Sequence, residues 1–117
     1  MSDTGMIFRE GDLLWAEISR AHQFTERLQG LLGINALTEA QGLLLIPCGS
    51  VHTIGMRFPI DVIFLDSSMR VRACHPEVQR WRWRGCWTAH STLEVSAGGV
   101  RRHAIKPGQY LQWRAHL

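Results

Sequence analysis

Apolar and polar positions along the chain alternate mainly at the period of a β-strand. In residues 12–20 and 69–75, apolar side chains recur at every second position, whereas residues 43–46 and 62–65 are continuous apolar runs. Alternation is typical of a strand with one buried face, and a short continuous run is typical of a strand buried on both faces. The predicted strands cover residues 12–20, 42–46, 60–65, 69–75, 91–95 and 109–113.

One segment has the period of a helix. Phe24, Leu28 and Leu31 recur at helical spacing, which places them on one face of a helix. The sequence therefore predicts one short helix over residues 24–33, and a further helical turn over residues 100–105.

About six short strands, one helix and short connections favour a mainly β fold, which is α+β by strict count. The strands are not separated by regular helices, as they would be in a parallel α/β fold. We therefore expect a single compact antiparallel β-sandwich or barrel with one short helix packed against it. A length of 117 residues suits one domain. We assign that domain to residues 12–117 and expect residues 1–11 to form a flexible N-terminus.

Composition narrows the class of protein. The formal net charge is +3, and Lys106 is the one lysine among 13 basic residues. Three cysteines, an odd number without a CxxC pair, argue against a disulfide framework or a four-cysteine zinc site. Residues 1–10 lack the apolar core of a signal peptide, and no apolar run approaches the roughly 20 residues that span a bilayer. We expect a soluble, cytoplasmic monomer without a metal or cofactor.

Several motifs together resemble one family. They are the glycine-led apolar run at residues 42–45, the segment His-Thr-Ile-Gly-Met-Arg-Phe-Pro-Ile-Asp-Val-Ile-Phe-Leu at 52–65, and Leu-Glu-Val-Ser-Ala-Gly at 93–98. In this order they resemble the DUF192 (UPF0127) family, from about residue 24 to 111. The resemblance implies a compact, mainly β single domain whose biochemical role is uncharacterised.

Cys48 and His52 are the first candidates for chemistry. A cysteine four residues before a histidine can form a nucleophile–base pair, for which Asp61 could orient the imidazole. The same two residues could contribute to a zinc site, but the remaining ligands would come from distant segments. A structural cysteine and a hydrogen-bonded histidine are the favoured interpretation.

Two carboxylates fall inside predicted core strands. Asp61 needs a partner there, since an unpaired buried charge costs several kcal/mol, and Arg27 or Arg57 could supply it. The pair is either a structural ion pair or part of a cleft in which arginine holds an anionic ligand group. Glu94 could act as a general base or accept hydrogen bonds from a turn, and the second role is favoured.

Arginine and tryptophan alternate in residues 80–87, Arg-Trp-Arg-Trp-Arg-Gly-Cys-Trp. In an extended chain the tryptophans share one face and the arginines the other. The favoured interpretation is structural, with the tryptophans on the core and the arginines in solvent. Binding of protein or an anion is the next interpretation, and nucleic-acid binding by stacking and phosphate contact comes last.

The preferred hypothesis is a module that binds a small anionic ligand or a peptide in a polar pocket. Arg27, His52, Asp61 and Glu94 would build this pocket, and residues 80–87 would form its rim. One alternative is a hydrolase-like enzyme that uses Cys48 or His52 with Asp61 and Glu94; another is weak nucleic-acid binding through residues 80–87. The predicted ligand-binding residues are Arg27, His52, Arg57, Asp61, Glu94, Arg80, Trp81, Arg82 and Trp83.

Overall fold

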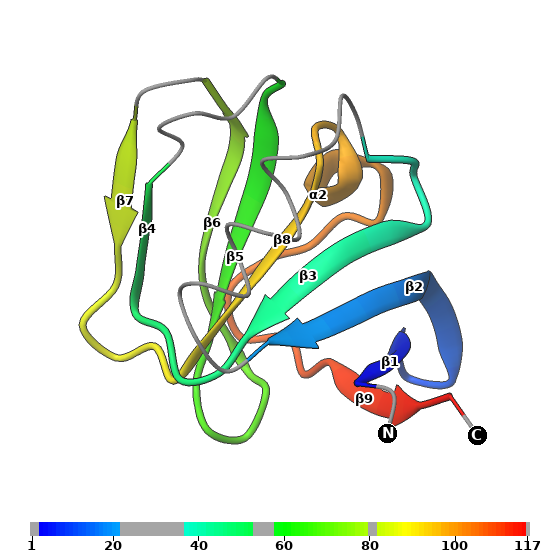
Figure 1. The fold of residues 1–117 in the computed structure, drawn as a ribbon. Helices are drawn as coiled ribbons and strands as arrows, with labels where there is room; N and C mark the ends of the chain where they lie inside the picture. The colour runs from blue at the N-terminus through cyan, green and yellow to red at the C-terminus, as the bar shows by residue number, and fades with distance from the viewer. Residues whose placement is uncertain (1–2, 22–36, 53–57, 80–81, 117) are drawn as a thin grey trace.

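The computed structural model describes residues 3–21, 37–52, 58–79 and 82–116. Within them the chain forms nine strands and one short helix, α2 (Gly99–Arg102) (Figure 1). The strands are β1 (Thr4–Arg9), β2 (Asp12–Ala21), β3 (Gln41–Leu45), β4 (Ser50–His52), β5 (Ile60–Leu65), β6 (Val71–Val78), β7 (Trp83–Gly85), β8 (Ser91–Ser96) and β9 (Gln112–Ala115).

Seven strands form one curved sheet in the order β6-β5-β8-β3-β2-β1-β9. All neighbouring pairs are antiparallel except β2 with β3, which is parallel. The two ends of the sheet also meet. The backbone N–H of Leu111 donates to the carbonyl of Met69 (2.9 Å), and that of Val71 donates to the carbonyl of Gln109 (2.8 Å). The sheet thereby closes into a barrel, which confirms the predicted mainly β fold.

The central strands bury both faces, as their apolar runs predicted. In β5, Ile63 and Leu65 belong to the cluster inside the barrel, whereas Val62 and Phe64 belong to a second cluster on the outer face. All six residues of β5 are buried. The strand is therefore a rigid support for any side chain that it carries.

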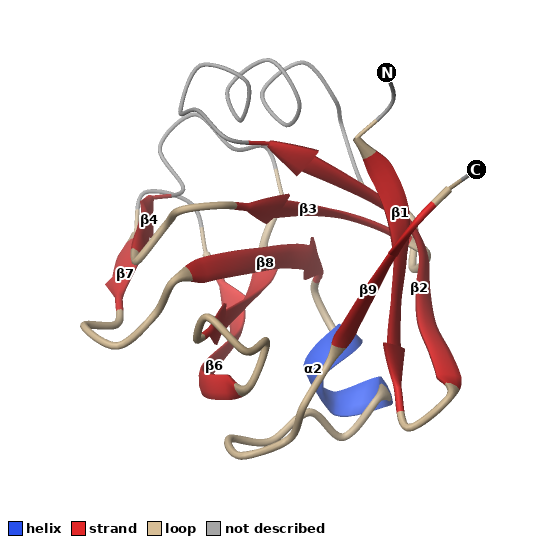
Figure 2. Cartoon of the chain, turned by 90° about the horizontal axis from the view of Figure 1, so that it is seen from below, coloured by secondary structure: helices blue, strands red, loops and turns tan. Residues whose placement is uncertain are grey.

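Strands β4 and β7 form a separate two-stranded ribbon. It packs on the outer cluster through the small side chains Cys48, Cys86 and Ala89. In both views the ribbon lies at the opposite end of the molecule from β1 and β9 (Figures 1 and 2).

The N-terminus differs from the sequence prediction. Residues 4–9 form β1, which pairs with β2 on one side and with β9 on the other. A tight turn at Glu10 (φ 51°) and Gly11 (φ 84°) reverses the chain between β1 and β2, and Ile7 is fully buried in the barrel. Pairing and burial order a segment that its polar and glycine residues had suggested to be flexible.

The helix predicted at residues 24–33 lies outside the described residues. The helix that the structure shows, α2, falls where the sequence predicted only a helical turn, and it begins after Gly98, whose φ of 101° suits glycine. In the described ranges, no helix has the length and apolarity needed to cross a membrane.

Candidate functional site

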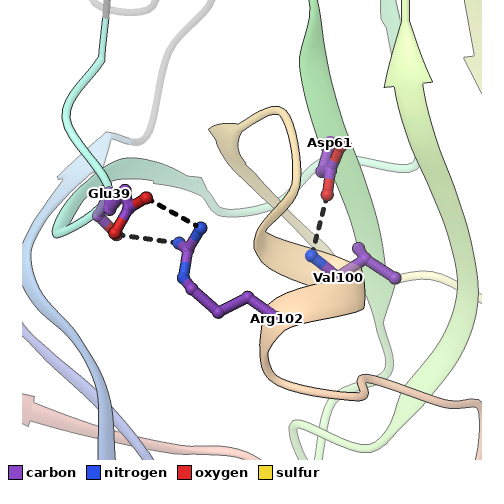
Figure 3. A network of polar contacts seen from close by, with 4 residues as sticks. All are labelled: Glu39, Asp61, Val100 and Arg102. Carbon is purple, nitrogen blue, oxygen red and sulfur yellow. Dashed lines mark hydrogen bonds and ion pairs between the residues drawn. The ribbon is translucent and has the colours of Figure 1, made fainter.

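Asp61 is completely buried and binds the backbone of two other segments. Its Oδ2 accepts a hydrogen bond from the N–H of Val100 (2.7 Å), in the first turn of α2, and its Oδ1 accepts one from the N–H of Glu77 (2.8 Å). Figure 3 shows the carboxylate pointing from β5 toward α2. The first N–H groups of a helix have no partner within it, and a carboxylate there satisfies them. Asp61 therefore fastens α2 to the barrel.

A second contact holds the same helix. Arg102 lies 3.6 Å from the carboxylate of Glu39 and also donates to the Glu39 carbonyl (3.3 Å) (Figure 3). Both side chains reach solvent, so the ion pair contributes little by itself. It links α2 to the segment that leads into β3.

Asp61 and Glu94 do not share a pocket. In the β5–β8 pair, Asp61 lies opposite Val95, and Val62 lies opposite Glu94. Residues that lie opposite each other in an antiparallel pair point to the same face of the sheet. Val95 belongs to the inner cluster and Val62 to the outer one, so the two carboxylates lie on opposite faces. The predicted pocket cannot contain both.

Other predicted site residues lie where the structure gives no side-chain description. Arg27, Arg57, Arg80 and Trp81 lie outside the described residues. His52 is described only by its backbone, which pairs with Trp83 in the ribbon. The part of the predicted pocket that they would form stays a prediction.

Cys48 is half-buried beneath the ribbon. Its thiol donates to the carbonyl of Ser50 (2.9 Å), and its backbone is held by His90 and by the hydroxyl of Thr92. Cys48 packs on the outer cluster, whereas Asp61 lies on the inner face, so Asp61 is not placed to orient a Cys48–His52 pair. Among the described residues, no three His, Cys, Asp or Glu side chains are grouped to hold a metal ion.

The reactivity of the Cys74 thiol tests whether this side chain is buried as the structure shows. Burial, together with the negative charge of Asp61, raises the pKa of its thiol from 9.0 to about 11. At pH 8 the thiolate fraction falls about 100-fold for a rise of this size. In the variant Cys48→Ser/Cys86→Ser, we expect alkylation of Cys74 by iodoacetamide, followed by mass spectrometry, to be about 100-fold slower than that of an ordinary thiol. The same protein in urea is the control and should react at the ordinary rate; equal rates when folded would contradict the burial.

The ribbon exposes its tryptophans. Trp83 is 65% exposed and Trp87 is fully exposed, so the prediction that Trp83 packs on the core is wrong. Small residues next to the ribbon, Cys48, Cys86 and Ala89, pack on the outer cluster instead. The Trp83 ring lies instead against Gly85, where an added Cβ would meet the ring at 2.6 Å. The outer edge of the indole therefore lies close to the backbone of its own strand.

Two arginines form hydrogen bonds with residues at or beside these tryptophans. Arg84 donates to the carbonyl of Trp83 (2.7 Å), and Arg72 of β6 donates to the hydroxyl of Thr88 (3.1 Å). Burial and, secondarily, the Arg84 charge lower the pKa of His75 on β6. The sequence has no Asp or Glu between Val78 and Leu93. We call Arg72, Arg82, Trp83, Arg84 and Trp87 the Arg/Trp surface.

The sequence prediction omitted one member of this surface, Arg72, whereas Trp87 lay within residues 80–87, the predicted rim. Residues 70–84 contain five arginines, and this clustering is the signal that could have extended the site to β6.

Family comparison decides how the chain is classified. The model of the DUF192 family, described as Uncharacterized ACR, matches residues 5–113. This chain belongs to the DUF192 family. The match covers nearly the whole length and agrees with the resemblance of the motifs at residues 42–45, 52–65 and 93–98. A search of curated proteins found no match to this DUF192 chain.

Two solved structures have the same fold as this DUF192 protein. A protein of unknown function from Novosphingobium aromaticivorans DSM 12444 aligns with a TM-score of 0.78 and 19% identity, over 94% of this chain and 84% of that one. A candidate transcription regulator from Sinorhizobium meliloti 1021 aligns with a TM-score of 0.80 and 19% identity, over 97% and 94%. At such low identity the two structures show the shared fold alone.

Proposed function

We propose that this DUF192 domain binds an anionic partner at the Arg/Trp surface. The observation that supports this function best is Trp83, which is 65% exposed although its ring lies close to Gly85. It stands between Arg82 and Arg84 in a segment without carboxylates. A small anionic ligand or an acidic peptide fits this chemistry, and the partner is held on the ribbon rather than in a pocket shared by Asp61 and Glu94.

Both the tryptophans and the arginines of the surface contribute to the free energy of binding. Covering the exposed part of one tryptophan contributes roughly 2–3 kcal/mol. Arginine forms two parallel hydrogen bonds with carboxylate or phosphate. Arg72 and Arg84 are already tethered to neighbouring oxygens, so they lose less side-chain freedom when a partner arrives.

The proposal is tested with labelled polyglutamate and polyphosphate by fluorescence anisotropy at physiological salt. We expect at least one of the two anions to bind, and the double variant Trp83→Ala/Arg84→Gln to weaken its binding tenfold or more. Both substitutions remove exposed or half-exposed groups and leave the barrel intact.

The chain offers a matched control elsewhere on its surface. Tyr110 is also an exposed aromatic residue (57%), and the Arg70 guanidinium lies 5.9 Å from its ring centre. The variant Tyr110→Ala/Arg70→Gln should bind like the unchanged protein. Equal losses in both double variants, or no binding of any anionic probe, oligonucleotides included, would overturn the proposed function.

A further inference from the structure

We infer that the anionic partner of the Arg/Trp surface is a single-stranded nucleic acid. This inference rests on the proposed function and adds the class of partner. The exposed aromatic faces of Trp83 and Trp87 carry it, because a polymer of bases matches flat rings interleaved with cations better than other polyanions do.

Trp83 is built as a stacking platform. Trp83 is 65% exposed although the outer edge of its ring lies close to Gly85, so most of the residue is open to a partner. A side chain that already contacts its own strand has less freedom to lose when a base stacks on it. Stacking of one base on an aromatic side chain contributes between roughly 5-fold and 150-fold in affinity. Polyglutamate has carboxylates for the arginines but no ring for this platform.

The exposure of Trp87 also favours a single-stranded nucleic acid as the partner. It is fully exposed and follows β7 by two residues, so it has no packing role that would explain an aromatic residue there. The rings of Trp83 and Trp87 thus provide two places for bases along one edge of the molecule, and stacking of this kind is tolerant of sequence because every base has a flat face.

The cations of the surface are all arginines. Arg84 is tethered to the Trp83 carbonyl, and Arg72 is tethered to Thr88. Each guanidinium carries five N–H donors, and one is used in each of these hydrogen bonds. The remaining donors suit phosphate oxygens, to which arginine binds with two parallel hydrogen bonds. Arg72 lies on β6 and Arg84 on β7, so the positive region extends from the ribbon onto the barrel.

A single strand fits this geometry better than a duplex. The bases of a duplex are already stacked on one another and cannot lie on Trp83 or Trp87. Three arginines neutralise about three phosphates, so the logarithm of affinity should fall with the logarithm of salt at a slope of roughly −2.

The test is fluorescence anisotropy of labelled oligo(dT) over a salt series, with polyglutamate, duplex DNA and anionic phosphatidylserine vesicles as competitors. We expect oligo(dT) to bind with a salt slope of roughly −2. The affinity should fall tenfold or more in Trp83→Ala and stay close to that of the unchanged protein in Trp83→Phe, which retains a flat ring. Trp87→Ala cannot act through folding, since the Trp87 side chain is fully exposed, and its affinity should fall about fivefold or more. Tyr110→Ala should bind like the unchanged protein.

The possible outcomes separate the two proposals. If polyglutamate or polyphosphate binds but oligo(dT) does not, the nucleic-acid inference is wrong and the proposed function stands. Preference for duplex DNA or for vesicles over oligo(dT) also overturns the inference. If Trp83→Ala and Trp87→Ala bind oligo(dT) as well as the unchanged protein does, the surface is not the binding site.

Discussion

Asp61→Ala is expected to lower the free energy of unfolding by about 3 kcal/mol. The carboxylate is fully buried and accepts hydrogen bonds from Val100 and Glu77. Removing it leaves two backbone N–H groups without their acceptor, and each such group costs about 1–3 kcal/mol when water cannot replace the partner. The loss should appear in urea unfolding followed by circular dichroism.

Asp66 supplies the matched control. Its Oδ1 also accepts two backbone N–H groups, those of Ser68 (2.8 Å) and Arg70 (3.0 Å), but in an exposed turn. Water can replace that carboxylate, so Asp66→Ala should cost clearly less than Asp61→Ala. Equal losses in the two variants would contradict a special role for the buried carboxylate. The loss of stability in Asp61→Asn should lie between those of Asp66→Ala and Asp61→Ala, because the amide keeps one acceptor oxygen but turns an NH₂ group toward the other donor.

Gly42→Ala is expected to destabilise the barrel by about 3 kcal/mol. A Cβ at this position would lie 2.7 Å from the carbonyl oxygen of Glu94, 2.8 Å from Ile18 and 2.9 Å from Val95. The first of these is backbone of the neighbouring strand, which cannot move without disturbing the β3–β8 hydrogen bonds. The expected result is a lower urea midpoint with an unchanged slope.

Gly49→Ala tests whether this effect is local. There the nearest atom to an added Cβ is the Cys86 carbonyl oxygen at 3.3 Å, and the ribbon can shift by the few tenths of an ångström required. The unfolding free energy should change much less than in Gly42→Ala. A large effect at Gly49 with none at Gly42 would show that strand separation in the barrel is not set by the glycine.

The sequence predicted the central strands well because their signal is local. The apolar run at residues 62–65 required burial on both faces, and β5 has that burial. By contrast, β1 depends on Gly5 and Ile7 pairing with Ala115 and Trp113. A contact across most of the chain leaves no mark in the local alternation of apolar positions.

The candidate site was predicted only in part for similar reasons. Asp61 was expected to need a charged partner, but its buried carboxylate is met by two backbone N–H groups, one of them from α2. The alternation of residues 80–87 predicted tryptophans on the core and arginines in solvent, but Arg82 and Trp83 are both exposed. Cys48, Cys86 and Ala89 pack on the outer cluster instead, and which side chains do so is a property of packing rather than of the period.

The pairing of β1 with β9 has a consequence for how the chain folds during synthesis. Gly5 lies opposite Ala115, so β1 has no partner on this side until β9, which is made much later, has left the ribosome. Until then the outer edge of β1 has unpaired N–H and carbonyl groups that can pair with another chain. Contacts of such long sequence separation also slow folding. A nascent or C-terminally shortened chain is therefore the form of this protein most exposed to aggregation.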